Sequence, residues 1–310
     1  MATVAVIGAG VIGAGWAAQC LAAGHDVVVH DPAPEAGPRL REAVLGAWPV
    51  LERLGLAADA STERLCFAAT AEEAVDEADF VQENGPERLD LKQRLVAALD
   101  AATRPEIVIA SSSSGLLPSQ VQETCAHHPE RVLVGHPFHP VHLLPLVEVV
   151  PGRRTSEDAV ARALAFYSAL GKRPIHVRRE LPGHITNRLQ AALWQEAYSL
   201  VERGAVSVAD LDTAISSGPG LRWALLGPLA TQHLSGGVGG LAHVLEHLGP
   251  PAQAWMDDLG TVQLTPELAE LLVQGVDAEL AGRDTAMLAR RRDELLVDLL
   301  AGKNAAHDLP

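Results

Sequence analysis

Short continuous runs of apolar residues recur along the first part of the chain, and stretches with helical spacing separate them. The strand-like runs cover residues 4–7, 27–29, 65–68, 80–82, 107–110, 132–135, 146–150 and 175–177. The main helical stretches lie at residues 35–57, 71–78, 87–102 and 156–170. Continuous apolar runs are typical of strands buried on both faces. Their alternation with helices predicts a doubly wound α/β fold, with helices on both faces of a parallel sheet.

The pattern changes after Pro182, where strand-like runs end. Helical spacing covers residues 184–203, 208–216 and 222–234, whereas glycine and proline recur through 235–251 and indicate a loop-rich insert. We therefore expect two domains, at residues 1–182 and 183–310, and the second should be all-helical.

A glycine-rich turn follows the first strand run and opens a helix. Its sequence is Gly8-Ala9-Gly10-Val11-Ile12-Gly13, and an acid, Asp31, ends the next strand. This context is typical of a Rossmann-type dinucleotide site, in which a helix N-terminus faces the pyrophosphate. The alternative is a turn that only packs. Asp31 would accept a hydrogen bond from a ribose hydroxyl and repel a 2′-phosphate, so we expect NAD rather than NADP. The predicted cofactor-binding residues here are Gly8, Gly10, Val11, Ile12, Gly13 and Asp31.

Charge and cysteine content narrow the class of protein. The 310-residue chain has a formal net charge of -15, which argues against nucleic acid or an anionic membrane as a partner. No apolar run is long enough to span a bilayer, and glycines interrupt the apolar stretch at residues 4–24. Three cysteines without metal-type spacing indicate a reducing compartment. We expect a cytoplasmic enzyme.

A histidine and a glutamate twelve residues apart supply the main candidate chemistry. His136 ends one apolar strand run, and Glu148 lies on the next. A carboxylate that orients an imidazole makes an acid/base pair for moving an alcohol proton. Beside a hydride carrier, such a pair indicates a dehydrogenase. The alternative for His136 alone is a buried structural histidine.

Two polar residues complete the candidate site. Ser114 belongs to a serine run after the strand at 107–110, and ligands of doubly wound sheets bind beyond the carboxyl ends of strands. The other serines of that run, 111–113, fit helix capping better. Asn187 lies one turn into the first helix of the second domain.

These motifs together resemble the 3-hydroxyacyl-CoA dehydrogenase family over nearly the whole chain. The resemblance includes the glycine turn, the segment Glu83 to Lys92, the serine run, the segment from His136 to Glu148, and Pro182-Gly183-His184-Ile185-Thr186-Asn187-Arg188-Leu189. It implies that Ser114, His136, Glu148 and Asn187 are catalytic, with Ser114 and Asn187 also holding the substrate oxygen. It also implies that Glu87 and Lys92 lie near the nicotinamide ribose.

One position departs from the family pattern, which usually has asparagine where this chain has His139. We expect this change to affect the local geometry more than the reaction. The three histidines 136, 139 and 142 also invite a metal reading, but Pro137 and Pro140 keep them off a common helical face, and no carboxylate or cysteine completes a ligand set. We expect no metal.

The segment Gly218 to Pro228 indicates the class of substrate. Its Arg222-Trp223 pair resembles the branch that contains L-gulonate 3-dehydrogenase, lambda-crystallin and L-carnitine dehydrogenase, whose enzymes use free 3-hydroxy acids. A guanidinium can bind a carboxylate with two hydrogen bonds, so we expect Arg222 to bind the substrate carboxylate. Trp223 could contact a trimethylammonium group. A surface arginine and a core tryptophan are the plainer alternatives.

The sequence thus predicts an NAD-dependent oxidoreductase that interconverts a gulonate- or carnitine-like L-3-hydroxy acid and its 3-keto acid. A 3-hydroxyacyl-CoA substrate, reduction of a 3-keto acid in polyketide tailoring, and a non-catalytic, crystallin-like role remain alternatives. Apolar residues in the helices at 184–203 and 208–216 exceed what one thin layer can bury, so we also expect a homodimer.

Overall fold

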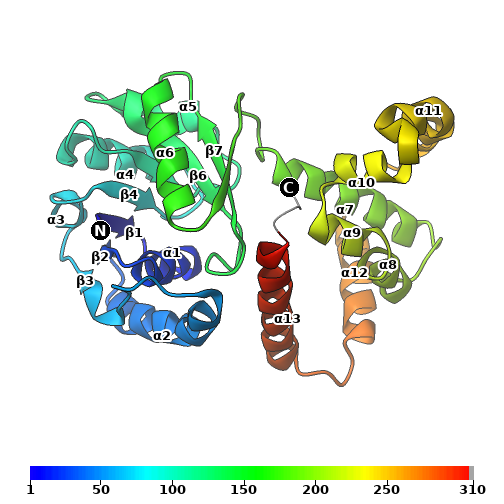
Figure 1. The fold of residues 1–310 in the computed structure, drawn as a ribbon, viewed down its shortest axis with the longest axis horizontal. Helices are drawn as coiled ribbons and strands as arrows, with labels where there is room; N and C mark the ends of the chain where they lie inside the picture. Colours follow the sequence, from blue (N-terminus) through cyan, green and yellow to red (C-terminus); the bar gives the residue numbers. More distant parts are fainter. Residues whose placement is uncertain (307–310) are drawn as a thin grey trace. The chain divides into compact units, whose positions relative to one another are not determined.

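The chain is described here from a computed structural model, in which residues 1–306 are placed. It forms two compact units: the first is Met1–Arg188 and the second begins at Leu189 (Figure 1). The first holds every strand of the described residues, and the second is helical. The division into functional domains at residue 182 stays a prediction.

One eight-stranded sheet forms the centre of the first unit. Its strands are β1 (Thr3–Ile7), β2 (Asp26–His30), β3 (Leu65–Phe67), β4 (Phe80–Glu83), β5 (Ile109–Ser111), β6 (Val132–Pro137), β7 (Leu146–Pro151) and β8 (Arg173–His176). They lie in the order β3-β2-β1-β4-β5-β6-β7-β8. The chain order reverses between β1 and β4, which is where doubly wound sheets bind their ligands.

The sheet is not wholly parallel, which corrects the sequence-based expectation. All neighbouring strands are parallel except β6 and β7, which pair antiparallel. Only residues 138–145 connect these two strands, and a parallel pair needs a crossover of a dozen or more residues. The short connection therefore reverses β7, and β8 follows the direction of β7.

Helices cover both faces of the sheet. They are α1 (Val11–Ala22), α2 (Ala36–Leu54), α3 (Ala71–Val75), α4 (Leu89–Ala102), α5 (Pro118–Val121) and α6 (Glu157–Ala169), with short 3-10 turns at Thr62–Arg64, Gln122–Thr124 and Pro129–Arg131. One buried cluster joins alternate residues of β1 and β2 to α1, α2 and α6. A second cluster joins the opposite face of β1 to α3, α4 and α5. This arrangement confirms the doubly wound fold class.

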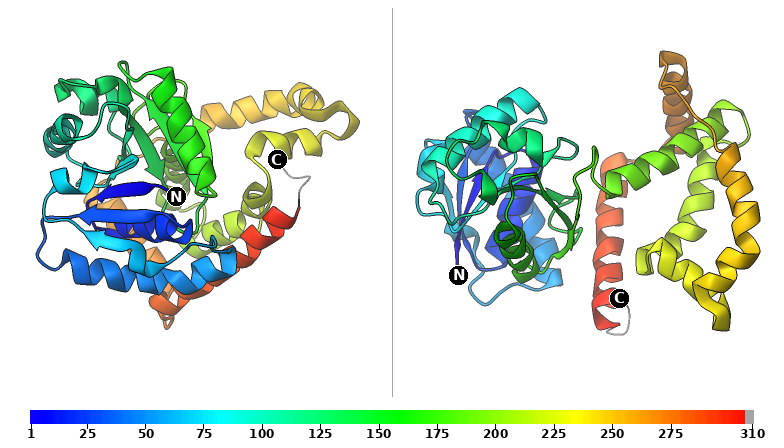
Figure 2. Two further views of the ribbon diagram at one scale, coloured as in Figure 1. Left: turned by 60° about the vertical axis from the view of Figure 1, so that its left-hand side comes forward. Right: turned by 90° about the horizontal axis from the view of Figure 1, so that it is seen from above.

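The second unit contains only helices among the residues that the structure describes (Figure 2). Helix α7 (Thr186–Glu202) leads into it, followed by α8 (Val208–Ser216), α9 (Pro219–Leu225), α10 (Pro228–Ser235), a 3-10 turn at Gly237–Gly239, α11 (Gly240–Asp258), α12 (Pro266–Glu279) and α13 (Thr285–Ala305). Over residues 1–306, no helix combines the length and the apolar character that a membrane span requires.

Two expectations about this unit are wrong. The stretch at 222–234 is two helices, because the chain is extended at Leu226 and Pro228 starts a new helix at its first turn. The stretch at 235–251 is not a loop-rich insert, since most of it lies in α11, which contains Pro250 and Pro251. Glycine and proline content alone favoured the loop, whereas the apolar spacing continues through these prolines.

Candidate active site

The glycine turn after β1 is shaped by close backbone contacts. Gly8 has φ 97°, and a Cβ there would lie 2.8 Å from the Asn84 carbonyl oxygen. A Cβ on Gly13 would lie 1.9 Å from the Gly8 carbonyl oxygen. Only glycine fits these two positions, because both contacts are with backbone.

The N-terminus of α1 is open toward the switch point of the sheet. Gly10 precedes the helix without a side-chain cap, and nothing lies within 4 Å of where its Cβ would be. The Val11 side chain is 70% exposed. An uncapped helix start with backbone N–H groups and free space fits a dinucleotide pyrophosphate.

Asp31 is half-buried just after β2 and has a role that the sequence did not reveal. Its Oδ2 accepts from the Ala9 N–H at 2.7 Å, and its Oδ1 accepts from the Ala33 N–H at 2.8 Å. Each carboxylate oxygen can accept a second hydrogen bond, so a ribose hydroxyl can still bind. Asp31 therefore also fixes the glycine turn.

The structure brings His136 and Glu148 together in a buried pair. They lie directly opposite each other in the antiparallel β6–β7 ladder. His136 Nδ1 is 2.8 Å from Glu148 Oε2, and the two residues are 4% and 0% exposed. The reversed strand thus explains how twelve residues of separation give one hydrogen-bonded pair.

A second set of donors holds the other oxygen of Glu148. Oε1 accepts from the backbone N–H of Ile185 at 3.1 Å, the N–H of Thr186 at 2.8 Å and the Thr186 hydroxyl at 3.1 Å. Burial by itself raises the pKa of the Glu148 carboxyl, but the hydrogen bond from His136, the backbone donors and the nearby imidazole outweigh it and lower that pKa below its ordinary value.

The ionised Glu148 fixes the tautomer of His136. A carboxylate only accepts, so Nδ1 must carry the hydrogen that bonds Oε2. Nε2 is then left with a lone pair and can take a proton from an alcohol. The pairing of His136 with Glu148 was predicted from the sequence, whereas Thr186 reaches the carboxylate only through the tertiary structure.

Ser114 and Asn187 also lie together. The Asn187 Nδ2 donates to the Ser114 carbonyl oxygen at 2.9 Å, and Ser114 itself is exposed. The Asn187 side chain, at the start of α7, therefore lies beside the loop that follows β5 and carries Ser114. Their roles in catalysis stay predictions.

Glu87 holds the loop that carries Ser114. Its Oε1 accepts from the Ser113 hydroxyl at 2.7 Å and from the N–H groups of Ser114 and Gly115 at 2.9 and 3.0 Å. The family resemblance implies that Glu87 lies near the nicotinamide ribose, and its contacts with the serine loop are an additional function that the sequence did not reveal. The Oε2 atom lies 3.8 Å from the Lys92 ammonium.

Lys92 is 1% exposed and pairs with a carboxylate that the sequence did not single out. Its ammonium lies 3.0 Å from both Glu83 carboxylate oxygens and donates to the Gly85 carbonyl oxygen at 3.0 Å. Glu83 also accepts from the Ser111 hydroxyl. Lys92 thus holds the Glu83 carboxylate, which in turn binds the end of β5, and its expected contact with cofactor stays a prediction.

Arg222 and Trp223 lie in the helical unit, on α9, and both side chains are exposed. Their expected contacts with substrate stay predictions. His139, the departure from the family pattern, is exposed between Phe138 and the buried Pro140. Within residues 1–306, no three or more histidine, cysteine or acidic residues are grouped to hold a metal ion.

Comparisons with known proteins identify the family. Residues 3–181 match the NAD binding domain of 3-hydroxyacyl-CoA dehydrogenase, and residues 183–283 match its C-terminal domain. An L-carnitine dehydrogenase of Streptomyces coelicolor is 52% identical over 96% of this chain and 93% of the relative. One of Pseudomonas putida is 48% identical over 99% and 96%.

A solved structure is similar along the whole length of the chain. It is FHMPC 5-dehydrogenase, described as an NAD⁺-dependent dismutase, with a TM-score of 0.85 and 29% identity over 98% of this chain and 99% of that one. Both domain models match, in the expected order along the chain. The fold also has an open helix N-terminus and a buried His–Glu pair. The chain belongs to the 3-hydroxyacyl-CoA dehydrogenase family and is an NAD-dependent oxidoreductase acting on a CH–OH group.

Proposed function

We propose that the chain is an L-carnitine dehydrogenase, which oxidises the 3-hydroxyl group of this free 3-hydroxy acid to a ketone. The buried His136–Glu148 pair carries the reaction, because it leaves one imidazole nitrogen as a base. The choice of carnitine is supported by relatives of about half-identical sequence that bear this name.

The residues of the site have separate roles in the oxidation. His136 Nε2 takes the hydroxyl proton, and Glu148 stabilises the imidazolium that forms. The side chains of Ser114 and Asn187 hold the substrate oxygen while its C–O bond gains double-bond character. When NAD is bound, it accepts the hydride that leaves the carbinol carbon.

The cofactor would be held mainly by the turn after β1. Backbone N–H groups of Gly10, Val11, Ile12 and Gly13 at the start of α1 would face the pyrophosphate, and Gly8 gives the turn its shape. Asp31 would accept from the adenosine ribose and disfavour NADP. Glu87 and Lys92 would lie near the nicotinamide ribose, with Glu87 holding the serine loop and Lys92 holding Glu83 at the end of β4.

The two ends of carnitine call for opposite partners, a cation for its carboxylate and an aromatic ring for its trimethylammonium group. We assign the carboxylate to Arg222 and the trimethylammonium group to Trp223, which are neighbours on α9. A guanidinium group binds a carboxylate through two parallel hydrogen bonds, and tryptophan is the aromatic side chain that forms the strongest cation–π contact.

Steady-state kinetics with L-carnitine and its carbon isostere, 3-hydroxy-5,5-dimethylhexanoate, test this assignment. The isostere has the same shape without the positive charge, so kcat/KM should fall about tenfold or more. Arg222→Met should raise KM for both compounds, whereas Arg290→Met, an exposed arginine of α13, should not. Equal kcat/KM for the two compounds, or an unchanged KM in Arg222→Met, contradicts the assignment.

We also propose that the enzyme is a homodimer formed through its helical unit. Among the described residues of that unit, only Val201, Leu268 and Val297 are buried apolar side chains. Many large apolar residues are exposed instead, Trp255 among them at 66%. So thin a core does not stabilise a helical layer alone, which favours a second copy as its cover.

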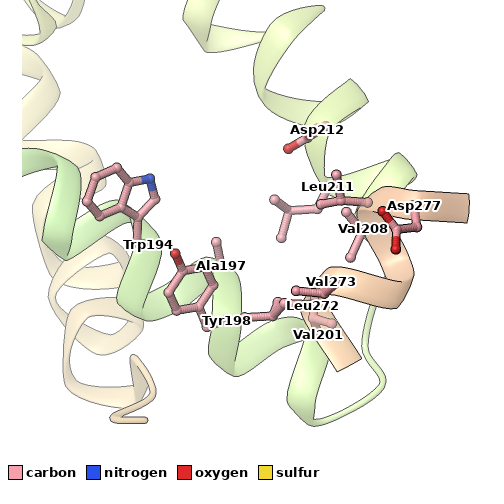
Figure 3. A pocket seen from close by; sticks show the side chains of 11 residues that line it. Trp194, Ala197, Tyr198, Val201, Val208, Leu211, Asp212, Leu272, Val273 and Asp277 are labelled. Carbon is pink, nitrogen blue, oxygen red and sulfur yellow. The ribbon is translucent and has the colours of Figure 1, made fainter. Parts of the chain in front are cut away.

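One groove of the helical unit fits this role. It lies between α7, α8 and α12, has a volume of about 420 Å³, and is lined mostly by apolar residues around Trp194 and Tyr198 (Figure 3). Asp212 and Asp277 lie at its edge. A helix from a second chain is an occupant of suitable size and polarity.

The cytoplasm is the compartment that we propose. All three cysteines are free, and Cys20 and Cys125 are buried. Burial raises the pKa of both thiols to about 12, so neither is reactive at neutral pH. Cysteines that form no disulfide are typical of proteins in reducing compartments.

A further inference from the structure

His184 is a buried histidine beside the catalytic pair that no role above explains. It lies between Gly183 and Ile185, in the segment before α7, and its side chain is 0% exposed. Its φ of 52° is positive, which among residues 1–306 is otherwise found only at glycines. A non-glycine residue in this region is strained, so the surrounding contacts must enforce the conformation.

The ring and the backbone of His184 join two parts of the site. Its Nε2 lies 3.1 Å from the Ser113 carbonyl oxygen, in the loop that carries Ser114. The next two residues, Ile185 and Thr186, donate their N–H groups to Glu148. The left-handed turn at His184 lets the ring face the serine loop while the following N–H groups face the carboxylate.

These contacts fix the protonation state of the ring. A carbonyl oxygen cannot donate, so Nε2 must carry the hydrogen. Nδ1 is buried and has no hydrogen-bond partner in the described residues. A proton on Nδ1 would therefore create a buried cation with one N–H group unsatisfied.

Other charges around the ring act in both directions. The His136 ring, on β6, lies 5.5 Å away between centroids, and Glu148 and Glu87 face the ring from β7 and from the segment after β4. Burial lowers the pKa of His184 most strongly, and a proton on His136 lowers it further. The Ser113 carbonyl and the two carboxylates raise it, but the net direction is down.

We propose that His184 is a positioning residue of the dehydrogenase reaction: in its neutral Nε2–H form it ties the Ser114 loop to the segment that holds Glu148. It keeps the substrate-oxygen donors and the acid/base pair in one arrangement. Because the ring stays neutral, it does not oppose the charge that His136 gains when it takes the hydroxyl proton. This role rests on the proposed function of the same site.

Two variants separate this role from simple packing. His184→Phe keeps a buried ring but loses the N–H donor, and should lower kcat about tenfold or more with little change in the Kd of NADH. His184→Gln keeps an N–H donor at similar reach and cannot titrate, so it should keep kcat within about threefold of the wild type. Its pH profile of kcat/KM should match that of the wild type.

Three kinetic outcomes would overturn the proposal. One is wild-type kcat in His184→Phe, which would make the donor unnecessary. The second is an equal loss in both variants, which would indicate packing alone. The third is a displaced acid limb of the pH profile in His184→Gln, which would mean that the His184 ring titrates during turnover.

Nitrogen-15 NMR of the histidine rings tests the same role without any substrate. With the His184 signals assigned by their loss in His184→Gln, the ring should hold the neutral Nε2–H form at pH 7 to 8 and should gain a proton only below the ordinary pKa of histidine. A doubly protonated ring or the Nδ1–H tautomer at pH 7 to 8 would refute the proposal, even if His184→Phe fails to fold. If carnitine is not turned over but the ring is neutral, the proposed substrate fails and the positioning role stands.

Discussion

A single hydrogen bond determines which atom of His136 can take a proton. The Glu148 Oε2 atom accepts from Nδ1, and three donors from Ile185 and Thr186 occupy Oε1. The carboxylate therefore cannot rotate without leaving donors unpaired in a buried place. His136 keeps its basic nitrogen on the side away from Glu148.

The variant Glu148→Gln tests this arrangement. The amide oxygen should stay with the Ile185 and Thr186 donors, which places the NH₂ group against Nδ1 and favours the opposite tautomer of His136. We predict a fall in kcat of about 10²- to 10⁴-fold, with the Kd of NADH unchanged in a fluorescence titration.

Glu130→Gln provides the matched control, because Glu130 forms a 2.9 Å pair with His128 in which both side chains are exposed, at 50% and 39%. That variant should keep wild-type kcat. If Glu148→Gln also keeps it, the role assigned to Glu148 is wrong.

At the scale of elements, the connection between β6 and β7 determines whether His136 and Glu148 meet. Lys172, which lies just before β8, donates from its buried side chain to the carbonyl oxygens of Val141 and Leu144 in this connection. Burial lowers the pKa of Lys172 to about 7. A neutral amine still has two N–H groups for these two acceptors.

The pH dependence of stability follows from this lysine. Between pH 7 and about 10.5, the unfolded chain binds a proton at Lys172 that the folded chain does not, so the free energy of unfolding rises with pH. The stability difference between wild type and Lys172→Met should grow in favour of wild type by about 2 kcal/mol from pH 7 to pH 9. Urea titrations at both pH values measure it. Parallel pH dependence of the two proteins would show that Lys172 stays protonated in the fold.

The sequence predicted most elements of the first unit, because buried strands and amphipathic helices each leave a regular apolar pattern. It missed the reversal of β7, which depends on the length of the connection rather than on the strand itself. It also missed α11, where Pro250 and Pro251 favoured a loop.

The sequence predicted many of the residues of the site but few of the contacts between them. His136 and Glu148 were paired from their strands, whereas Thr186, Glu83 and His184 act through contacts between distant segments. The sequence signal for His184 was its place beside Gly183 in a family motif, which did not reveal its left-handed backbone. The hydrogen bonds from Ile185 and Thr186 to Glu148 Oε1 could not be inferred from the spacing of residues in the sequence.

At the scale of the whole molecule, the thin core of the helical unit predicts association. Light scattering of the purified protein should give twice the mass of one chain. Val273→Asp places a charge in the groove of Figure 3 and should shift the protein to monomer. Leu45→Asp, at an exposed apolar position of α2, should not. A monomeric wild type, or a dimeric Val273→Asp, would contradict the assigned interface.

Activity of the whole enzyme depends on whether the acid it oxidises is free or joined to coenzyme A. The direct measurement is kcat/KM with NAD for L-carnitine, L-gulonate, L-3-hydroxybutyrate and L-3-hydroxybutyryl-CoA under the same conditions. We predict that L-carnitine has the highest value, exceeding the CoA thioester by about 100-fold or more. A higher kcat/KM for the thioester would contradict the proposed function.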